Sequence, residues 1–312
     1  MNLNHLLETA SFTKDEVISY INAADDMKKC LSDGNKCSIL SNKILVTMFF
    51  EPSTRTSCSF QSAMLRLGGS VISLTDKYSS VEKGETLEDT IRSLSCYADA
   101  IVLRHPLKGS AKLAASVSTV PIINAGDGNG EHPSQALLDI YTIHSELVSL
   151  EGDMENNLIV TFLGDLKNSR TIHSLIRLLC LFPKMKFVYI SPSGLEMPAE
   201  IVEFVSSKNI EQFAGMSLEA AIRITDVLYV TRIQKERFTD INSYNSVSQY
   251  CVDAAVLKAA KKKMIIMHPL PRNQEIAVDV DKDPRAVYFT QMKNGLYMRM
   301  AILSRLLSKN GV

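Results

Sequence analysis

The sequence predicts an α/β protein built from two doubly wound parallel-sheet domains. Short apolar runs alternate with segments of helical periodicity along most of the chain, and parallel strands need helical crossovers of this kind. The same pattern restarts after a polar, acidic segment from Ser149 to Asn157, which contains Gly152. The 312 residues are enough for two ordinary domains.

In the first half, strands and helices follow one another in a regular order. Gly68 and Gly69 end the first helix, Thr86 caps the second, and Pro133 begins the third, because proline in a first helical turn loses no needed donor. The expected elements are strands at 44–50, 71–74, 100–103 and 121–125, and helices at 53–67, from Thr86 to about Ala98, and from Pro133 to about His144.

In the second half, the same alternation continues to the end of the chain. The last helix carries an apolar stripe that includes Met292, Leu296 and Met300. The expected elements are strands at 158–163, 187–190, 227–230 and 264–267, and helices at 169–181, 198–206 and 289–307.

Composition argues against several classes of protein. Lys plus Arg and Asp plus Glu number 34 each, so the formal net charge is zero and no nucleic-acid partner is expected. No apolar stretch is long enough to span a bilayer, so no membrane partner is expected. The six cysteines form no C-x-x-C pair and show no zinc-ligand spacing with a histidine, which predicts no metal site. Free thiols packed as small hydrophobes, together with an N-terminus that lacks a signal-peptide pattern, predict a cytoplasmic protein.

Polar or proline-rich segments follow six of the expected strands. In an open parallel sheet, ligands bind outside the carboxyl ends of the strands, whereas chance would scatter polar residues over both ends. This arrangement predicts one large active site, formed by both halves of the chain in the cleft between them. The six segments are residues 51–56, 104–106, 132–135, 164–170, 231–234 and 268–272.

In the first half, the residue types suit a phosphate. Residues 53–56 place hydroxyls and an arginine at a helix N-terminus, where unpaired N–H groups and the helix dipole favour an anion. Arg104 and His132 follow other strands of this half and can polarise a carbonyl group. The alternatives are an ordinary helix cap with a surface arginine, a structural histidine, and a merely polar helix position at Gln135.

In the second half, Arg170 and Arg232 suit carboxylates, because the guanidinium fork matches a carboxylate group bidentately. The alternative is ordinary surface ion pairing. The polar loop at residues 79–85 is, from its composition alone, a solvated loop.

Seven short motifs, taken together, resemble one protein family. They run from about Phe49 to Arg299 in an order and spacing that is similar to the catalytic chains of aspartate carbamoyltransferases, in the aspartate/ornithine carbamoyltransferase family. The resemblance implies transfer of a carbamoyl group from carbamoyl phosphate to the amino group of L-aspartate, an early step of de novo pyrimidine biosynthesis, without a cofactor. The motifs are S-T-R-T at 53–56, K-G-E-T at 83–86, R-H-P at 104–106, H-P-S-Q at 132–135, G-D-L-K-x-x-R-T at 164–171, T-R-x-Q-K-E-R at 231–237 and H-P-L-P-R at 268–272.

The resemblance also implies two substrate-binding domains and a set of site residues. Residues 1–148, completed by a C-terminal helix at 289–312, would bind carbamoyl phosphate, and residues 149–288 would bind aspartate. The implied phosphate contacts are Ser53, Thr54, Arg55 and Thr56, the carbonyl-oxygen contacts are Thr54, Arg104 and His132, and the carbamoyl amide contact is Gln135. The implied aspartate contacts are Arg170, Arg232 and Gln234, with the backbone of Leu270 lining the site before a non-trans bond to Pro271.

The resemblance further implies a homotrimer with shared active sites. Ser79 and Lys83 would reach the site of a neighbouring subunit, which replaces the solvated-loop interpretation of that segment. Thr54, Arg55, Lys83, Arg104 and His132 would then be the catalytic residues. The family also includes members that bind a separate regulatory chain, and the sequence leaves that partner open.

Three other functions fit the sequence less well. An ornithine-type carbamoyltransferase usually has an H-C-L-P segment and a D-x-x-x-S-M-G loop, and neither occurs here. A non-catalytic paralogue would be expected to lose Arg55, Lys83, Arg104 or His132, and all four are present. A nucleotide-dependent dehydrogenase is disfavoured, because the glycines at 126, 128 and 130 lack the full G-x-G-x-x-G spacing.

Overall fold

The computed structural model of the chain describes residues 4–34, 37–75, 84–150, 152, 154, 157–234 and 250–308. The chain divides into two compact units, one formed by Met1–Tyr141 with Lys293–Val312, the other by Thr142–Met292. Both divisions fall within a helix, the first in α5 (Pro133–Ser149) and the second in α11 (Tyr288–Leu307).

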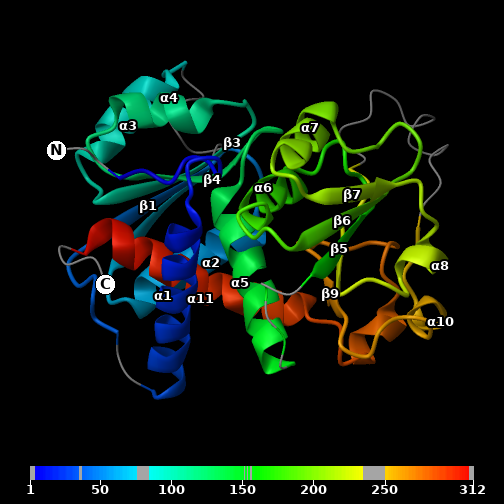
Figure 1. Cartoon of the computed structure of the whole chain (residues 1–312). Coiled ribbons are helices and arrows are strands. Elements are labelled where there is room, and N and C mark those ends of the chain that lie inside the picture. Colours follow the sequence, from blue (N-terminus) through cyan, green and yellow to red (C-terminus); the bar gives the residue numbers. More distant parts are fainter. Residues whose placement is uncertain are drawn as a thin grey trace. The chain divides into compact units, whose positions relative to one another are not determined.

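The first unit is organised around a four-stranded parallel sheet of order β2-β1-β3-β4. Its core on one face consists of apolar side chains from the strands together with Ile91 and Ala114 of the helices that cover them. Figure 1 shows α3 and α4 side by side on this face, and α2 packs against β1 and β2. The strands are β1 (Ile44–Phe49), β2 (Ser70–Thr75), β3 (Ala100–His105) and β4 (Ile122–Asp127), and the helices, besides α5 and α11, are α1 (Lys14–Ser32), α2 (Thr54–Arg66), α3 (Leu87–Ser95) and α4 (Ser110–Val117).

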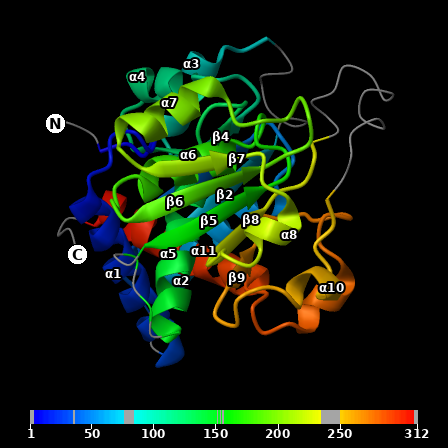
Figure 2. The same cartoon turned by 45° about the vertical axis from the view of Figure 1, so that its right-hand side comes forward.

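The second unit contains a five-stranded parallel sheet of order β7-β6-β5-β8-β9. Helices α6 and α7 contact each other, and Figure 2 shows α8 and α10 close to β8 and β9. Apolar residues of α8 and α10 share a buried cluster with the strands and with Tyr288. The elements are β5 (Leu158–Leu163), β6 (Met185–Ile190), β7 (Glu211–Ala214), β8 (Val227–Val230), β9 (Ile265–Met267), α6 (Arg170–Leu179), α7 (Ala199–Ser207), α8 (Leu218–Ala221), α10 (Ala254–Leu257) and a 3₁₀ helix at Val278–Lys282.

Each sheet has one point where the strand order reverses. In the first unit the chain adds β2 on one side of β1 and then β3 on the other, and in the second it adds β6 and β7 on one side of β5 and then β8 on the other. The reversal points therefore lie between β1 and β3 and between β5 and β8. Such switch points are where open α/β sheets bind ligands. The expected fold class of two doubly wound parallel-sheet domains is confirmed.

Several elements were missed or misplaced by the sequence analysis. Helix α1 was not predicted, although Thr13 and Glu16 form a complete capping box at its start. Helix α4 and strand β7 were also missed, and α5 continues to Ser149, five residues past its expected end at His144. Strand β7 is short and mostly exposed at the sheet edge, so it lacks the buried apolar run by which the other strands were recognised.

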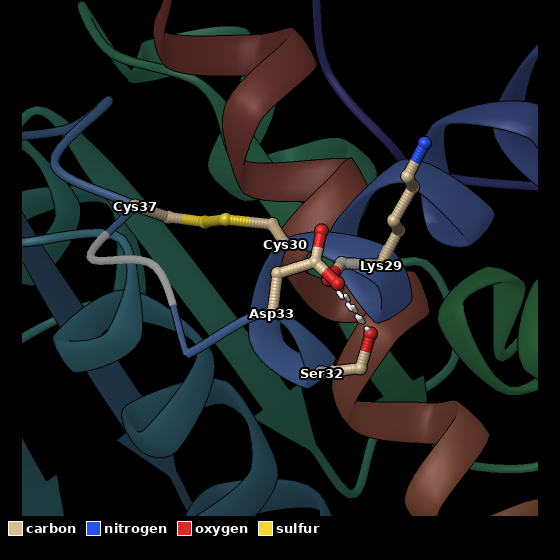
Figure 3. Close-up of a disulfide and its surroundings, with 5 residues drawn as sticks. All are labelled: Lys29, Cys30, Ser32, Asp33 and Cys37. Carbon is tan, nitrogen blue, oxygen red and sulfur yellow. Dashed lines mark hydrogen bonds between the residues drawn. A yellow bond between two sulfur atoms is a disulfide. The ribbon is translucent and has the colours of Figure 1, made fainter.

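The cysteines differ from expectation. Cys30 and Cys37 form a disulfide, with Cα atoms 6.8 Å apart (Figure 3), so the expectation of six free thiols is wrong for this pair. The expectation that the cysteines pack as small hydrophobes is wrong for Cys58, Cys96 and Cys251, which are exposed, and right for Cys180, whose thiol pKa is raised to about 12 by burial. Sequence spacing did not reveal the disulfide, because a separation of seven residues does not by itself bring two cysteines within bonding distance.

Within the part of the chain that the structure describes, no helix is both long and apolar enough to cross a membrane.

Candidate functional site

The N-terminus of α2 differs from those of α1 and α3 in the same unit. Ser53 occupies the N-cap position, but its side chain makes no capping hydrogen bond, and the first turn carries no acidic residue. By contrast, the hydroxyl of Thr13 accepts from Glu16 N–H at the start of α1, and that of Thr86 accepts from Asp89 N–H at the start of α3. The ordinary-cap alternative is therefore not what the structure shows for Ser53. The first N–H groups of α2 keep their capacity to bind an anion.

The S-T-R-T side chains do not all face the same way. Thr54 and Arg55 are exposed and Ser53 is half-buried, whereas Thr56 is buried at 6% exposure. The Thr56 side chain is therefore largely covered by the rest of the protein. Its backbone N–H, one of the first-turn donors, is the group that can meet a bound anion.

Arg104 lies beside the end of β1. It is paired in register with Phe49, and its Nη1 donates to the carbonyl oxygen of Ala125 at 3.4 Å. Its Nε lies 3.2 Å from Oε2 of Glu51, and both side chains are largely buried. This ion pair orients the guanidinium group next to the start of α2. The sequence predicted no role for Glu51, and the only signal was its position two residues before Ser53, the first residue of the S-T-R-T motif.

The loop before α5 is organised by one carboxylate. Asp127 Oδ1 accepts from Glu131 N–H, and Oδ2 accepts from Gly109 N–H at the start of α4, both at 2.8 Å. Gly128 has a φ of +55°, and a Cβ there would lie 2.6 Å from the carbonyl oxygen of Pro106. The glycines at 126–130 thus serve a tight loop that delivers His132.

His132 and Gln135 lie at the start of α5, after β4. His132 is buried, its carbonyl accepts from Gln135 N–H at 3.0 Å, and its Nδ1 lies 3.4 Å from the Ser134 hydroxyl. The side-chain nitrogen of Gln135 donates to Asp139 Oδ1 at 2.9 Å. Since β1, β3 and β4 are consecutive neighbours in the sheet, their carboxyl ends place residues 53–56, Arg104, and the His132–Gln135 turn at one sheet edge.

In the second unit, Gly164 lets two strand ends approach closely at the switch point. Its φ is +120°, and a Cβ there would lie 2.0 Å from the carbonyl oxygen of Thr231. Thr231 N–H also donates to Leu163 O at 2.8 Å, which extends the pairing of β5 with β8. This explains the glycine that begins the G-D-L-K motif.

A buried carboxylate joins the segments after β5 and β8. Asp165 has no exposed surface and accepts from the backbone N–H of Asn168 at 3.0 Å and of Gln234 at 3.3 Å. The Gln234 side-chain nitrogen donates to Asn168 O at 2.9 Å. Gln234 is therefore held beside the segment that leads into α6, where Arg170 is the first helical residue.

The start of α6 resembles that of α2. Its N-cap residue, Ser169, makes no side-chain capping bond, and its first turn carries no acidic residue. Arg170 and, after β8, Arg232 are half-buried. A small pocket lies close to these residues at the carboxyl ends of β5 and β8. It is lined by Leu163, Gly164, Pro192, Val230, Thr231, Ile233, Tyr250 and Glu275.

The H-P-L-P-R motif follows β9. The peptide bond between Leu270 and Pro271 is cis, which confirms the expected non-trans bond. Arg272 does not face an open site, because its guanidinium binds both carboxylate oxygens of Asp281 and donates to the Tyr288 hydroxyl. The arginine of this motif therefore has a structural role in the second unit.

Two expected site residues, Ser79 and Lys83, lie outside the described residues. Among the residues that are described, no group of three or more His, Cys, Asp or Glu side chains is placed to hold a metal ion.

Residues 4–145 match the family described as aspartate/ornithine carbamoyltransferase, carbamoyl-P binding domain, and residues 156–306 match its Asp/Orn binding domain. The aspartate carbamoyltransferase catalytic subunit of Methanocaldococcus jannaschii is 48% identical over 99% of this chain and 99% of that protein. The chain belongs to the aspartate/ornithine carbamoyltransferase family. The resemblance inferred from the seven motifs is thereby confirmed.

Two further comparisons add to the family assignment. The multifunctional protein CAD of Squalus acanthias is 48% identical over 98% of this chain, and the chain spans 13% of that protein's length. A crystal structure of aspartate transcarbamoylase from Trypanosoma cruzi in complex with carbamoyl phosphate and aspartate superposes with a TM-score of 0.91. It is 42% identical, and the match covers 96% of both chains.

Proposed function

We propose that this chain is an aspartate carbamoyltransferase, which converts carbamoyl phosphate and L-aspartate to N-carbamoyl-L-aspartate and phosphate in de novo pyrimidine biosynthesis. The observation that carries the proposal is that each sheet presents one group of family-motif residues at its own switch point. Hydroxyls and a cation that suit a phosphate ester follow β1, and a second cation, Arg104, lies near the carboxyl end of β3. Two arginines that suit a dicarboxylate follow β5 and β8.

Carbamoyl phosphate is assigned to residues 1–148 together with the C-terminal helix 289–312. The uncapped first turn of α2, with Ser53, Thr54, Arg55 and the backbone N–H of Thr56, would hold the phosphate. Thr54, Arg104 and His132 would contact the carbonyl oxygen, and Gln135 the carbamoyl amide.

Aspartate is assigned to residues 149–288. Arg170 and Arg232 would bind its two carboxylates, with Gln234 held next to them by Asp165 and Asn168. Two cationic side chains favour a dicarboxylate over ornithine, whose side chain ends in an amine. The backbone of Leu270, before Pro271, would complete this group.

The reaction proceeds by direct attack. The deprotonated amino group of aspartate forms a bond to the carbonyl carbon, the bond from that carbon to the phosphate oxygen breaks, and the amine loses its second proton. Negative charge that develops on the carbonyl oxygen is met by Thr54, Arg104 and His132, and removal of one such donor typically lowers the rate by ~10²–10³. Holding two small anions in line can lower the barrier by roughly 7–11 kcal/mol. No covalent intermediate and no cofactor are needed.

The proposed active assembly is a homotrimer in which Ser79 and Lys83 complete a neighbouring subunit's site. Mixing inactive Lys83→Ala and Arg55→Ala chains should restore part of the activity, because some sites then combine two intact contributions. No recovery after subunit exchange, verified by mass spectrometry, would count against shared sites. A separate regulatory chain is also proposed as a partner, and it should co-purify with the chain from the source cells.

A cytoplasmic location is also proposed. Exposed thiols such as Cys58 and Cys96 persist in reducing compartments, whereas the bond between Cys30 and Cys37 is typical of oxidising ones. The two kinds of compartment can be distinguished by counting the free thiols of protein that is treated with an alkylating agent at cell lysis. A cytoplasmic chain should carry Cys30 and Cys37 in the reduced form.

The direct test of function is an assay with the purified chain. Carbamoyl phosphate and L-aspartate together should give stoichiometric phosphate and N-carbamoyl-L-aspartate, while L-ornithine in place of aspartate should give no product above the rate of spontaneous hydrolysis. Failure to form carbamoyl-aspartate, or a preference for ornithine, would overturn the proposal.

A further inference from the structure

We propose that His268 is a positioning residue that holds the backbone of Leu270 in place for the acceptor substrate. This inference rests on the proposed function, because it concerns the acceptor side of the same site. His268 lies directly after β9, with only 1% of its surface exposed. None of the roles assigned above involves its imidazole ring.

Three hydrogen bonds fix His268. Its backbone N–H donates to Oε1 of the fully buried Gln291 at 3.0 Å. Its ring Nδ1 accepts from Leu270 N–H at 2.8 Å, and its ring Nε2 lies 2.8 Å from Oε1 of Glu275. Both ring nitrogens are therefore engaged, and they face two different parts of the same loop.

These contacts define the protonation state of the ring. Nδ1 accepts from an N–H group, so it carries no proton, and Nε2 must then carry the proton that is donated to Glu275. Glu275 itself is held by the backbone N–H of Asn273, at 3.1 and 3.2 Å to its two oxygens, and it lines the pocket at the ends of β5 and β8. His268 thus connects a wall of that pocket to Leu270.

Leu270 needs such a connection. Its φ of +53° lies in the left-handed region. For a residue that has a side chain, this backbone conformation is unfavourable in free energy, and it persists only where the surrounding structure imposes it. The bond to His268 Nδ1 is a contact that imposes it. Because this bond engages the Leu270 N–H, the backbone group that Leu270 can offer a substrate is its carbonyl oxygen. A carbonyl oxygen suits the N–H groups of the reactants and not their anionic groups.

A matched pair of substitutions separates positioning from simple packing. His268→Asn places an acceptor near the position of Nδ1 and loses the donor to Glu275, whereas His268→Gln reaches toward Glu275 and loses the acceptor for Leu270 N–H. His268→Gln should raise the KM for aspartate by about tenfold or more, and His268→Asn by less than about threefold. The KM for carbamoyl phosphate should stay near that of the wild type in both variants. Equal effects of the two substitutions on the aspartate KM would overturn the proposal.

A second measurement does not depend on how well the variants fold. In the unsubstituted protein labelled with ¹⁵N-histidine, His268 should give the shifts of a neutral imidazole protonated at Nε2 near neutral pH. A ring protonated at Nδ1, or at both nitrogens, would overturn the proposal, because Nδ1 could not then accept from Leu270. An enzyme that shows this tautomer but forms no carbamoyl-aspartate would disprove the proposed function while the hydrogen bond itself stands.

Discussion

The side-chain nitrogen of Gln135 donates to Oδ1 of Asp139, 2.9 Å away, and Asp139 has no exposed surface. A carboxylate only accepts, so the amide NH₂ of Gln135 must face it, and its Oε1 is directed elsewhere as an acceptor. That acceptor suits the NH₂ group of carbamoyl phosphate. Burial lowers the pKa of the Arg299 guanidinium to about 10. The negative charge of Asp139 opposes this shift and so favours the charged form of Arg299.

Asp139→Asn should therefore destabilise the first unit and weaken carbamoyl phosphate binding. The loss should be about 1–3 kcal/mol, because the buried guanidinium of Arg299 loses the carboxylate that favours its charged form. Urea denaturation measures this loss. Asp25→Asn is the matched control, since exposed Asp25 accepts from the Tyr141 hydroxyl in the same unit, and it should cost about 1 kcal/mol. Equal losses in the two variants would contradict a stabilising effect of the buried Asp139 carboxylate on Arg299.

Arg55→Ala should reduce turnover by at least about 10²-fold while the chain stays folded, because Arg55 supplies a cation at the anion-binding first turn of α2. Steady-state assays and circular dichroism check the two parts of this statement. Arg66→Ala removes an exposed arginine from the last turn of the same helix and should leave turnover unchanged. Near-normal activity of Arg55→Ala would disprove the phosphate assignment.

Arg232→Ala should chiefly raise the KM for aspartate, by about 10²-fold, because truncating a charge-assisted bidentate contact costs roughly 2–3 kcal/mol. Initial rates measured against aspartate at saturating carbamoyl phosphate give this value. The exposed Arg223, also in the second unit, provides the control. An unchanged aspartate dependence in Arg232→Ala would remove Arg232 from the site.

Gly164→Ala should cost about 3–5 kcal/mol of folding free energy, since the new Cβ combines left-handed backbone strain with a clash against Thr231 O. Gly194→Ala separates the two effects. Gly194 has a φ of +84°, but nothing lies within 4 Å of its Cβ position, so only the strain of about 1–2 kcal/mol remains. Similar unfolding midpoints for the two variants would show that β5 and β8 do not need this close approach.

Stability should also depend on pH through His268. Burial, with smaller contributions from Arg272 and Arg232, lowers the pKa of His268 below 6.5, against the opposing effect of Glu275. As the pH falls below 6.5, the unfolded chain takes up a proton before the folded chain does. The free energy of unfolding should therefore decrease toward the folded pKa, by at most about 1.4 kcal/mol per pH unit from this residue.

The pH effect is checked with His268→Asn, which removes the titrating group. Urea midpoints at about pH 7.5 and about pH 5.5 should differ less in this variant than in the wild type, because only the wild type binds the extra proton on unfolding. Identical pH dependence in both proteins would show that His268 contributes nothing to acid lability.

Much of the fold was predictable, because strands and helix starts have signatures in short stretches of the sequence. Apolar runs located β1, β5 and β8 within one or two residues, and Thr86 and Pro133 marked the helix starts that the structure has. Edge strand β7 was missed, because an exposed edge carries no comparable apolar signal. The family motifs placed most of the proposed site residues at strand ends, where helix or loop begins.

The sequence by itself determined the two parallel α/β domains and the chemical character of the segments after each strand, since periodicity and residue type are local properties. Only the tertiary structure decided which strand ends are neighbours. It showed that β1 lies next to β3 and that β5 lies next to β8. It alone showed that Glu51 pairs with Arg104 and that His268 holds Leu270. These relationships depend on contacts between segments that the fold brings together, and spacing along the chain does not specify such contacts.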